Sequence, residues 1–562
     1  MITQIISSSR LLIILWLLTL LIAGAWVRVH GVNEYFYSTD ELQHITISKG
    51  ETVSEVAKFS ALETHPPYPQ ILRHYLLAIS DTPWFLRGES VVFGLLCILI
   101  YYAIGNMMGG PPAGCIAAWF IAFGYGSIIE SQIVRNYSLL ALLLGVAFYF
   151  YQAFLRTGKR SCLFGYAAGV LLALMAHYSA AFALVCMGGV GFIRLLWTKD
   201  RRSELCWWTA VNALLVFYFC CVYAMEIRHN AYEAVFLLNN KIATESPLYG
   251  TTGFRAALLV VYIPATVSYF LHSSFSNQQN ILSIFLFLCA MTGIYAFSLG
   301  RALLWEALLA LVLGAILLAA NIYPYAFRIA GRHAMWELPY VILPVSLFLA
   351  YGARLLVARV PAGTVKKTTA AGMVIGVAMG FLINDTKVFF DDLREYELNN
   401  AQGQELDSFL ASLTSEDIVI SGSLNTMYLL PDGRSYYRAL LATGGQLPYY
   451  SVARGEARIV YTHFYPPILQ DKFASLRDLM TLMDASGELK HIRTVWFFNT
   501  IGASWNIDKC ALPATRIIPF YHTGDGLMKG AGPIAEFIGI PYDSIKRNIL
   551  QKASLCGASA LQ

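Results

Sequence analysis

Two neighbouring stretches decide the fold class of this chain. Residues 11–26 read LLIILWLLTLLIAGAW, and residues 35–49 read YFYSTDELQHITISK, with Asp40 and Glu41 side by side and His44 one helical turn further on. A helix needs about 20 apolar residues to cross a bilayer, and ionisable side chains are costly inside the hydrocarbon. The first stretch is therefore a predicted membrane span, and the acidic pair lies just beyond it.

The composition extends this conclusion to the whole chain. Of its 562 residues, 57% are hydrophobic and only 13% are charged, whereas soluble domains carry about 25% charged residues. A net charge of +5 over this length is too diffuse to indicate nucleic acid as a partner. No small-x-small cleavage site follows the first apolar run, so an uncleaved span is expected there instead of a secretory signal. The composition predicts a polytopic α-helical membrane protein.

Loop charges predict the topology of the spans. The connectors at 156–161, 198–202 and 353–367 are rich in Lys and Arg, which places them in the cytoplasm. An even number of crossings must lie between two cytoplasmic loops, so the apolar stretch 254–271 is predicted to be an interfacial or re-entrant helix. Eleven spans result, with the N-terminus inside and the C-terminus outside. The predicted spans are 11–27, 88–106, 112–129, 137–155, 162–176, 179–197, 205–226, 281–299, 303–320, 337–353 and 368–385.

The last third of the chain changes character. Residues 403–423 have the pattern of an amphipathic helix, a turn and a buried strand, and the strand pattern recurs at 456–464 and 492–499. Strands alternating with helices indicate a small α/β domain, here extracytoplasmic. The domains expected are 1–389 and 390–562. No Gly-rich strand-to-helix loop of the dinucleotide type is present, so no nucleotide is assigned. Two cysteines of this part, Cys510 and Cys556, can form a disulfide if it is extracytoplasmic.

The acidic pair has a structural and a chemical interpretation. Ser38 and Glu41 match a capping box, which explains Glu41 without any function. It explains Asp40 only weakly and His44 not at all. Asp40 and His44 are four residues apart and share one side of a helix. A carboxylate at the membrane surface could deprotonate a hydroxyl acceptor or hold a cation that bridges to phosphate.

Further motifs carry a resemblance to a known family. An acidic pair in the first outer loop, followed by THPPYPQILRHYLLA, resembles the membrane glycosyltransferases of the GT-C class, near the protein mannosyltransferase and aminoarabinose transferase group (glycosyltransferase family 39 type). FLRGESVVFGLL resembles the Arg-initiated second span of that family, and the turn with Glu130, Arg135 and Tyr137 resembles its E-x-R-x-Y motif with different spacing. AHYSAAF and GRHAMWELPYVILP resemble later landmarks. These five segments are residues 64–78, 85–96, 130–151, 176–182 and 331–344.

The resemblance implies an activity and a set of site residues. Such enzymes take a sugar from a polyprenyl-phosphate carrier and invert its anomeric centre, here to a lipid, glycan or protein acceptor in a bacterial cell envelope. Asp40 is then the catalytic base and Glu41 caps or supports it. Whether a divalent metal ion takes part stays open. The implied substrate-binding residues are His44, His65, Arg135, Tyr137, His177, Arg332 and His333.

Several of these residues also have simpler explanations. His65 precedes Pro66 and Pro67, which punctuate turns without any chemistry. Arg135 and Tyr137 can snorkel at the end of a span, and His177 can be a satisfied residue of a helical hairpin. Arg332 and His333, in contrast, put positive charge in an outer loop, where a phosphate contact explains them better.

Two other functions stay open at this stage. A transporter or lipid-linked-sugar flippase would carry ionisable groups near the midplane and often internal repeats, whereas here the span centres are nearly free of charge. A scaffold whose tail binds partners is the other alternative. The sequence names neither the sugar nor the acceptor.

Overall fold

The structure is a computed structural model that describes most of the first 227 residues and separate parts of the rest. The described residues are 2–30, 32, 37, 39–62, 65–198, 200–227, 262–263, 266–267, 269–271, 277–296, 301–319, 334–359, 400–421, 433–443, 449–454, 456–461, 476–500, 516–520, 535–541 and 543. The predicted span 368–385, the site residues Arg332 and His333, and the cysteines Cys510 and Cys556 lie outside them.

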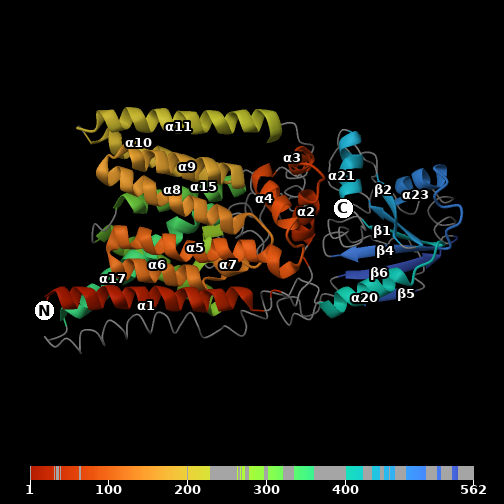
Figure 1. Cartoon of the computed structure of the whole chain (residues 1–562), viewed down its shortest axis with the longest axis horizontal. Helices are drawn as coiled ribbons and strands as arrows, with labels where there is room; N and C mark the ends of the chain where they lie inside the picture. The colour runs from red at the N-terminus through yellow and green to blue at the C-terminus, as the bar shows by residue number, and fades with distance from the viewer. Residues whose placement is uncertain are drawn as a thin grey trace.

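A bundle of long apolar helices forms one end of the molecule (Figure 1). Within the described ranges, five helices are long and apolar enough to cross a membrane, and five shorter apolar helices accompany them. The chain is a multi-pass membrane protein, as its composition predicts. The helices are α1 (Ile2–Val29), α5 (Pro83–Gly109), α6 (Pro111–Phe123), α8 (Tyr137–Thr157), α9 (Arg160–Ala176), α10 (Ala180–Leu196), α11 (Arg202–Val222), α14 (Asn277–Ala296), α15 (Arg301–Ala319) and α17 (Leu338–Arg359).

Ten of the eleven predicted spans coincide with helices, and one of these helices is interrupted. The predicted span 112–129 is divided into two helices, because α6 ends at Phe123 and α7 (Tyr125–Ile129) begins after Gly124. Gly124 has an extended backbone with ψ 134°. A Cβ there would lie 2.5 Å from the Phe120 carbonyl oxygen and 2.6 Å from that of Phe270. Only glycine fits this break without displacing either carbonyl.

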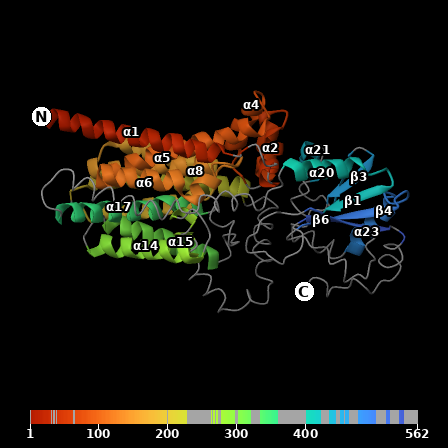
Figure 2. The same ribbon diagram turned by 90° about the horizontal axis from the view of Figure 1, so that it is seen from below.

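The interior of the bundle is filled by buried side chains, and its outer surface carries exposed apolar side chains. Its interior holds aromatic side chains such as Tyr101 and Phe148, which are fully buried. On the outer surface of α11, Leu214 is 68% exposed and Phe217 is 67% exposed. Apolar side chains this exposed suit a lipid surface and would be unfavourable in water. Figure 2 shows α1 on one side of the bundle and α14, α15 and α17 on the other.

Three short helices lie at one end of the bundle, in the segment between α1 and α5 that the sequence predicts to be the first outer loop, and are called the outer-loop helices (Figure 1). They are α2 (Thr39–Ser48), α3 (Val53–Leu62) and α4 (Pro67–Leu77). The His-Pro-Pro motif begins α4, since Pro67 occupies its first helical position, where a missing N–H costs nothing. The three helices pack against one another and separate the bundle from the C-terminal part of the chain.

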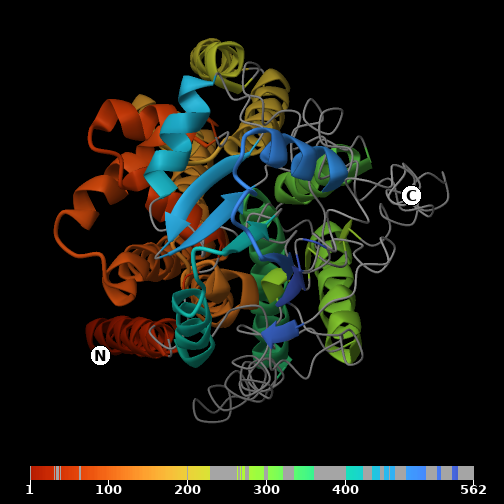
Figure 3. The same cartoon turned by 90° about the vertical axis from the view of Figure 1, so that its right-hand side faces the viewer.

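The C-terminal part is a mixed sheet with helices, as its sequence predicts. The strands run in the order β2-β3-β1-β4-β6-β5, and β1 is parallel to both β3 and β4. Figure 3 shows the sheet and its helices across the end of the bundle. The elements are α20 (Asn400–Ala411), β1 (Asp417–Ser421), α21 (Gly433–Ala442), β2 (Tyr450–Arg454), β3 (Ala457–Tyr461), α23 (Leu476–Ala485), β4 (Thr494–Thr500), β5 (Arg516–Phe520) and β6 (Ala535–Pro541).

The outer-loop helices and the C-terminal part share one hydrophobic core. Ile47, Val56 and Phe59 are fully buried in a cluster with side chains of α20, α21 and β1. The Phe59 and Tyr437 rings stack with their centroids 5.3 Å apart. Beside them, Arg438 forms ion pairs of 2.6–2.7 Å with Glu55 and Glu51. The C-terminal part therefore packs directly on α2, which carries the acidic pair, and on α3, which follows it.

Candidate functional site

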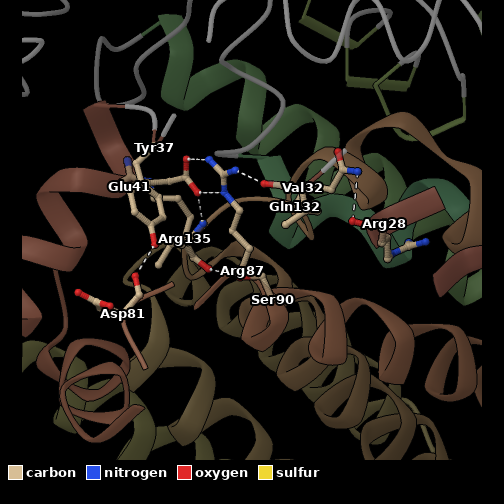
Figure 4. Close-up of polar contacts among 10 residues, drawn as sticks. Arg28, Val32, Tyr37, Glu41, Asp81, Arg87, Ser90, Gln132 and Arg135 are labelled. Carbon is tan, nitrogen blue, oxygen red and sulfur yellow. Dashed lines mark hydrogen bonds and ion pairs between the residues drawn. The ribbon is translucent and has the colours of Figure 1, made fainter. Parts of the chain in front are cut away.

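Glu41 is held by a buried ion pair at the start of α2 (Figure 4). Arg87 of α5 donates from Nε to one carboxylate oxygen and from Nη2 to the other, both at 2.8 Å. The backbone N–H of Val134 donates a third bond at 2.9 Å. Arg87 also donates to the Val32 carbonyl, and the Tyr37 ring lies 5.3 Å from its guanidinium carbon. Glu41 is thus engaged in positioning α2 on the bundle.

The turn after α7 is tied to the end of the first span. Gln132 donates from its amide to the carbonyls of Val27 and Arg28, at 3.0 and 3.2 Å. Arg28 is fully buried and donates to the carbonyls of Ile121 and Ala122 at 2.7 and 2.8 Å. A cation at the C-terminus of α6 satisfies carbonyls that the helix leaves without partners. This turn, which carries Arg135, therefore has a fixed position beside α2.

Four of the site residues named from the sequence form a chain of ring contacts. The ring centroids of His44 and His65 lie 4.9 Å apart, those of His65 and His177 lie 6.2 Å apart, and those of His177 and Tyr137 lie 5.1 Å apart. The guanidinium carbon of Arg135 lies 5.9 Å from the Tyr137 ring centre. Residues from four separate regions of the sequence thus meet beside the acidic pair.

His177 also has a structural role in the hairpin between α9 and α10. It follows the last residue of α9 in an extended conformation. Its Nδ1 accepts the backbone N–H of Ser179 at 3.2 Å and lies 2.8 Å from the Ser179 hydroxyl. A backbone N–H can only donate, so the proton of the neutral ring is on Nε2. The hairpin fixes the ring, and the ring faces His65 and Tyr137.

A buried polar layer from α4 lies next to His44. Arg73 is fully buried and pairs with Glu89 of α5 at 3.1 Å. Both Arg73 Nη1 and Gln70 Nε2 lie 3.5 Å from His44 Nδ1. Burial is the main cause that lowers the pKa of His44 well below 6.5, and the positive charge of Arg135 is the next. His44 is therefore a neutral imidazole at physiological pH.

The structure brings together five of the nine residues that the sequence singles out, and places Glu41 beside them. Asp40 belongs to α2, but its side chain lies outside the described part of the chain, as do Arg332 and His333. Sequence reasoning missed Gln70, Arg73 and the partner role of Arg87. A charged residue in an apolar helix usually has a partner. Arg87 of the FLRGESVV segment therefore indicated that a buried acid would pair with it. Gln70 and Arg73 lie in the 64–78 segment that resembles the family, but nothing within that segment singles out Gln70.

Within the described residues, no group of three or more His, Cys, Asp or Glu side chains is arranged to hold a metal ion. The ring chain of His44, His65 and His177 is not such a group. These residues are suited to hydrogen bonding and not to metal binding. A neutral histidine, a guanidinium and several fixed rings form a polar surface suited to hydroxyl and anionic groups.

Comparisons with known proteins give likenesses of fold alone. No protein-family model and no curated protein matches the chain. An oligosaccharyltransferase from Archaeoglobus fulgidus is 11% identical, with a TM-score of 0.48 over 96% of this chain and 78% of the other. ArnT from Cupriavidus metallidurans, bound to undecaprenyl phosphate, is 12% identical, with a TM-score of 0.45 over 81% and 98%. Arabinosyltransferase EmbB from Mycobacterium smegmatis is 10% identical, with a TM-score of 0.36 over 78% and 42%.

At these identities and TM-scores, none of the three assigns an activity or a substrate to this chain. The structure itself, a bundle of apolar helices with a small mixed sheet, has the fold class predicted from the sequence. The solved structures that resemble the chain are polytopic glycosyltransferases of the GT-C class, the class that its motifs resemble.

Proposed function

We propose that this protein is an inverting glycosyltransferase that moves a sugar from a polyprenyl-phosphate carrier to an acceptor in the cell envelope. The observation that carries the proposal is the placement of α2. The ion pair between Glu41 and Arg87 fixes the helix of the acidic pair at the end of the bundle, beside the histidine chain. In this proposal the end of the bundle is the outer face of the cytoplasmic membrane, with the N-terminus in the cytoplasm and the C-terminal part outside.

The proposed reaction is a single displacement. Asp40 takes the proton of an acceptor hydroxyl, and the resulting oxygen attacks the anomeric carbon opposite the phosphate. The bond between that carbon and the phosphate oxygen breaks, and the electron pair leaves with the carrier phosphate. Negative charge grows on the phosphate during this step, so nearby cations lower the barrier. Arg135 is our candidate within the described residues, and Arg332 and His333 are candidates from the sequence.

Glu41 has a separate task in this mechanism. Three donors already use its two oxygens, and its side chain is fully buried. A carboxylate in that state is a poor proton acceptor, because its negative charge is stabilised by the guanidinium. Glu41 is therefore proposed as the positioning residue of the pair and Asp40 as the base.

The buried acid of α15 gives no support to transport as the alternative function. Glu306 of α15 is fully buried, but it accepts hydrogen bonds from Tyr151 at 2.7 Å and from Gln152 at 3.4 Å. Tyr151 lies 14 residues along α8 from Tyr137, which is about 21 Å at the helical rise of 1.5 Å per residue. This acid is locally satisfied and remote from the histidine chain.

The test compares two carboxylates of the same outer region. Wild type, Asp40→Asn and Asp81→Asn are purified, and sugar transfer from a panel of polyprenyl-phosphate sugars to envelope extract is measured. Asparagine still caps a helix, and Asp81 is exposed, so all three should fold. We expect near-complete loss of transfer in Asp40→Asn and nearly unchanged transfer in Asp81→Asn. Full activity of Asp40→Asn would show that Asp40 is not the catalytic base. A folded wild type that transfers no sugar from any donor would favour the transporter as the function.

A further inference from the structure

Two buried polar atoms of the outer-loop helices have no hydrogen-bond partner within the described residues. They are Nε2 of His44 and the side-chain oxygen of Gln70. His44 is 1% exposed and Gln70 is 0% exposed. Leaving a buried donor or acceptor without a partner costs about 1–3 kcal/mol, and native structures rarely do so twice in adjacent side chains. The site therefore suits a ligand that satisfies both atoms.

The neighbours of His44 determine which of its nitrogens carries the proton. Arg73 Nη1 lies 3.5 Å from His44 Nδ1, and a guanidinium can only donate. Nδ1 must therefore be the acceptor, so the proton of the neutral ring is on Nε2. Gln70 Nε2 lies at the same distance from Nδ1 and donates to it as well. The unpartnered atoms are consequently one donor, His44 Nε2–H, and one acceptor, Gln70 Oε1.

A donor next to an acceptor selects for a hydroxyl-bearing ligand over an anion. A phosphate at neutral pH offers mainly acceptors, which Gln70 Oε1 would repel. Arg73, whose Nη1 lies 3.5 Å from His44 Nδ1, pairs with buried Glu89, and this pairing offsets its charge. A hydroxyl group both donates and accepts. Sugar hydroxyls are therefore the groups that fit His44 and Gln70.

We propose that His44 Nε2–H and Gln70 Oε1 bind hydroxyl groups of the transferred sugar, and so form a sugar subsite on α2 and α4. This inference rests on the proposed function, since it takes the ligand to be the sugar of the donor. It adds a residue, Gln70, that lies in the 64–78 segment but is not among the site residues named from the sequence, and it gives His44 a defined tautomer and a defined partner. The acidic residue next in sequence to Glu41, Asp40, lies one turn before His44 on the same helix.

The experiment measures binding, so that it does not depend on transfer. Full-length protein in nanodiscs is titrated with undecaprenyl phosphate and with its glucose, galactose, mannose and arabinose derivatives. The quantity of interest is the ratio of the Kd of undecaprenyl phosphate to the Kd of the sugar-carrying form. We expect at least one sugar to give a ratio of roughly 10 or more in the wild type, because two buried hydrogen bonds are gained.

Matched variants assign that ratio to the two atoms. In His44→Asn the side-chain amide can take the position of Nδ1 but is too short to reach the position of Nε2. In His44→Gln the longer side chain can place an amide N–H at the position of Nε2. Gln70→Met keeps the shape and removes the acceptor. We expect the ratio to fall roughly tenfold in His44→Asn and Gln70→Met and to survive in His44→Gln. Thermal unfolding of each variant shows whether it is folded.

Each result decides the inference. Equal ratios in wild type, His44→Asn and Gln70→Met would overturn it and would assign the two atoms to a buried structural water. A ratio near 1 for all four sugars in the wild type would also overturn it. If the sugar-dependent ratio behaves as expected but no sugar is transferred, the subsite stands and the proposed function fails.

Discussion

Arg87 and Glu41 are 46 residues apart in the sequence and form two parallel hydrogen bonds of 2.8 Å in the buried end of the bundle. This one pair joins the second predicted span to the helix that carries the acidic pair. Its two side chains are 2% and 0% exposed. Charges this buried are stable only as long as each has its partner.

Removing either partner of this pair should strongly destabilise the protein. Glu41→Gln leaves the Arg87 guanidinium buried without its counter-charge, and breaking such a pair costs about 3–5 kcal/mol. The matched control is Asp407→Asn, whose partner Arg454 forms a more exposed pair, worth about 0–1 kcal/mol. Thermal unfolding in detergent compares the two variants. A loss in Glu41→Gln as small as that in Asp407→Asn would contradict the positioning role.

Acid should destabilise the protein through His44. Burial lowers its pKa well below the 6.5 of an exposed histidine, so below pH 6.5 the unfolded chain binds a proton that the folded one does not. Stability from this group is complete above pH 6.5 and falls, as the pH drops, by up to about 1.4 kcal/mol per pH unit. The charged and titratable groups that lower this pKa are Arg135, His65, Arg73 and His177.

The measurement is the unfolding temperature between pH 7.5 and 5.5. We expect its slope to be shallower in His44→Asn than in the wild type, because asparagine does not titrate. His74→Asn is the control, since His74 is on the neighbouring helix and its Nδ1 donates to the Ser48 carbonyl at 3.0 Å. Identical slopes in the wild type and His44→Asn would show that the pKa of His44 does not differ between the folded and the unfolded chain.

Truncating Phe59 should loosen the C-terminal part. Its ring is fully buried against Tyr437 in the shared core, and Phe→Ala in a core costs about 3–5 kcal/mol. Phe164→Ala is the control, because Phe164 is 62% exposed on the apolar surface of the bundle. Limited proteolysis should cleave α2 and α3 faster in Phe59→Ala than in Phe164→Ala. Equal cleavage would mean that the contact contributes little.

Removing one hydroxyl should destabilise the bundle without affecting transfer. Tyr151→Phe takes a hydrogen bond from the buried Glu306 carboxylate and should cost about 1–3 kcal/mol. Tyr149→Phe, on the same helix, is the matched control, because its side chain is only half-buried. Unfolding temperature and kcat are measured for both. A large drop in kcat for Tyr151→Phe would give Glu306 a part in the reaction.

The long elements of the fold could be predicted from the sequence, because each depends on a local pattern. Apolar runs predicted the positions of ten described helices, one of them interrupted, and short strand patterns predicted β1, β3 and β4. The interruption at Gly124 was not predicted. A Cβ there would meet the carbonyls of Phe120 and Phe270, and Phe270 is about 150 residues away in sequence. Local patterns contain no information about such contacts.

The site was predictable only in part for the same reason. Asp40, Glu41 and His44 stand out as polar residues after a span. The pairing of Glu41 with Arg87, and the burial of Gln70 against His44, depend on how α4 and α5 pack. Ile47, Val56 and Phe59 are apolar residues in a predicted outer loop, which implies a partner surface, but nothing in their spacing identifies α21.

The contact between Arg438 and Glu55 has a consequence for how the protein is made. The two residues are separated by 383 positions. At a synthesis rate of about 5–20 residues per second, roughly 20–80 s pass between the appearance of one and the other. During that interval α3 exposes Phe59 and Val56 without their final neighbours. Arg87 follows Glu41 by only 46 residues, so α2 can be fixed on the bundle long before α3 gains the neighbours that cover Phe59. The polar end of the bundle is thus assembled in two steps that are separated by most of the synthesis time.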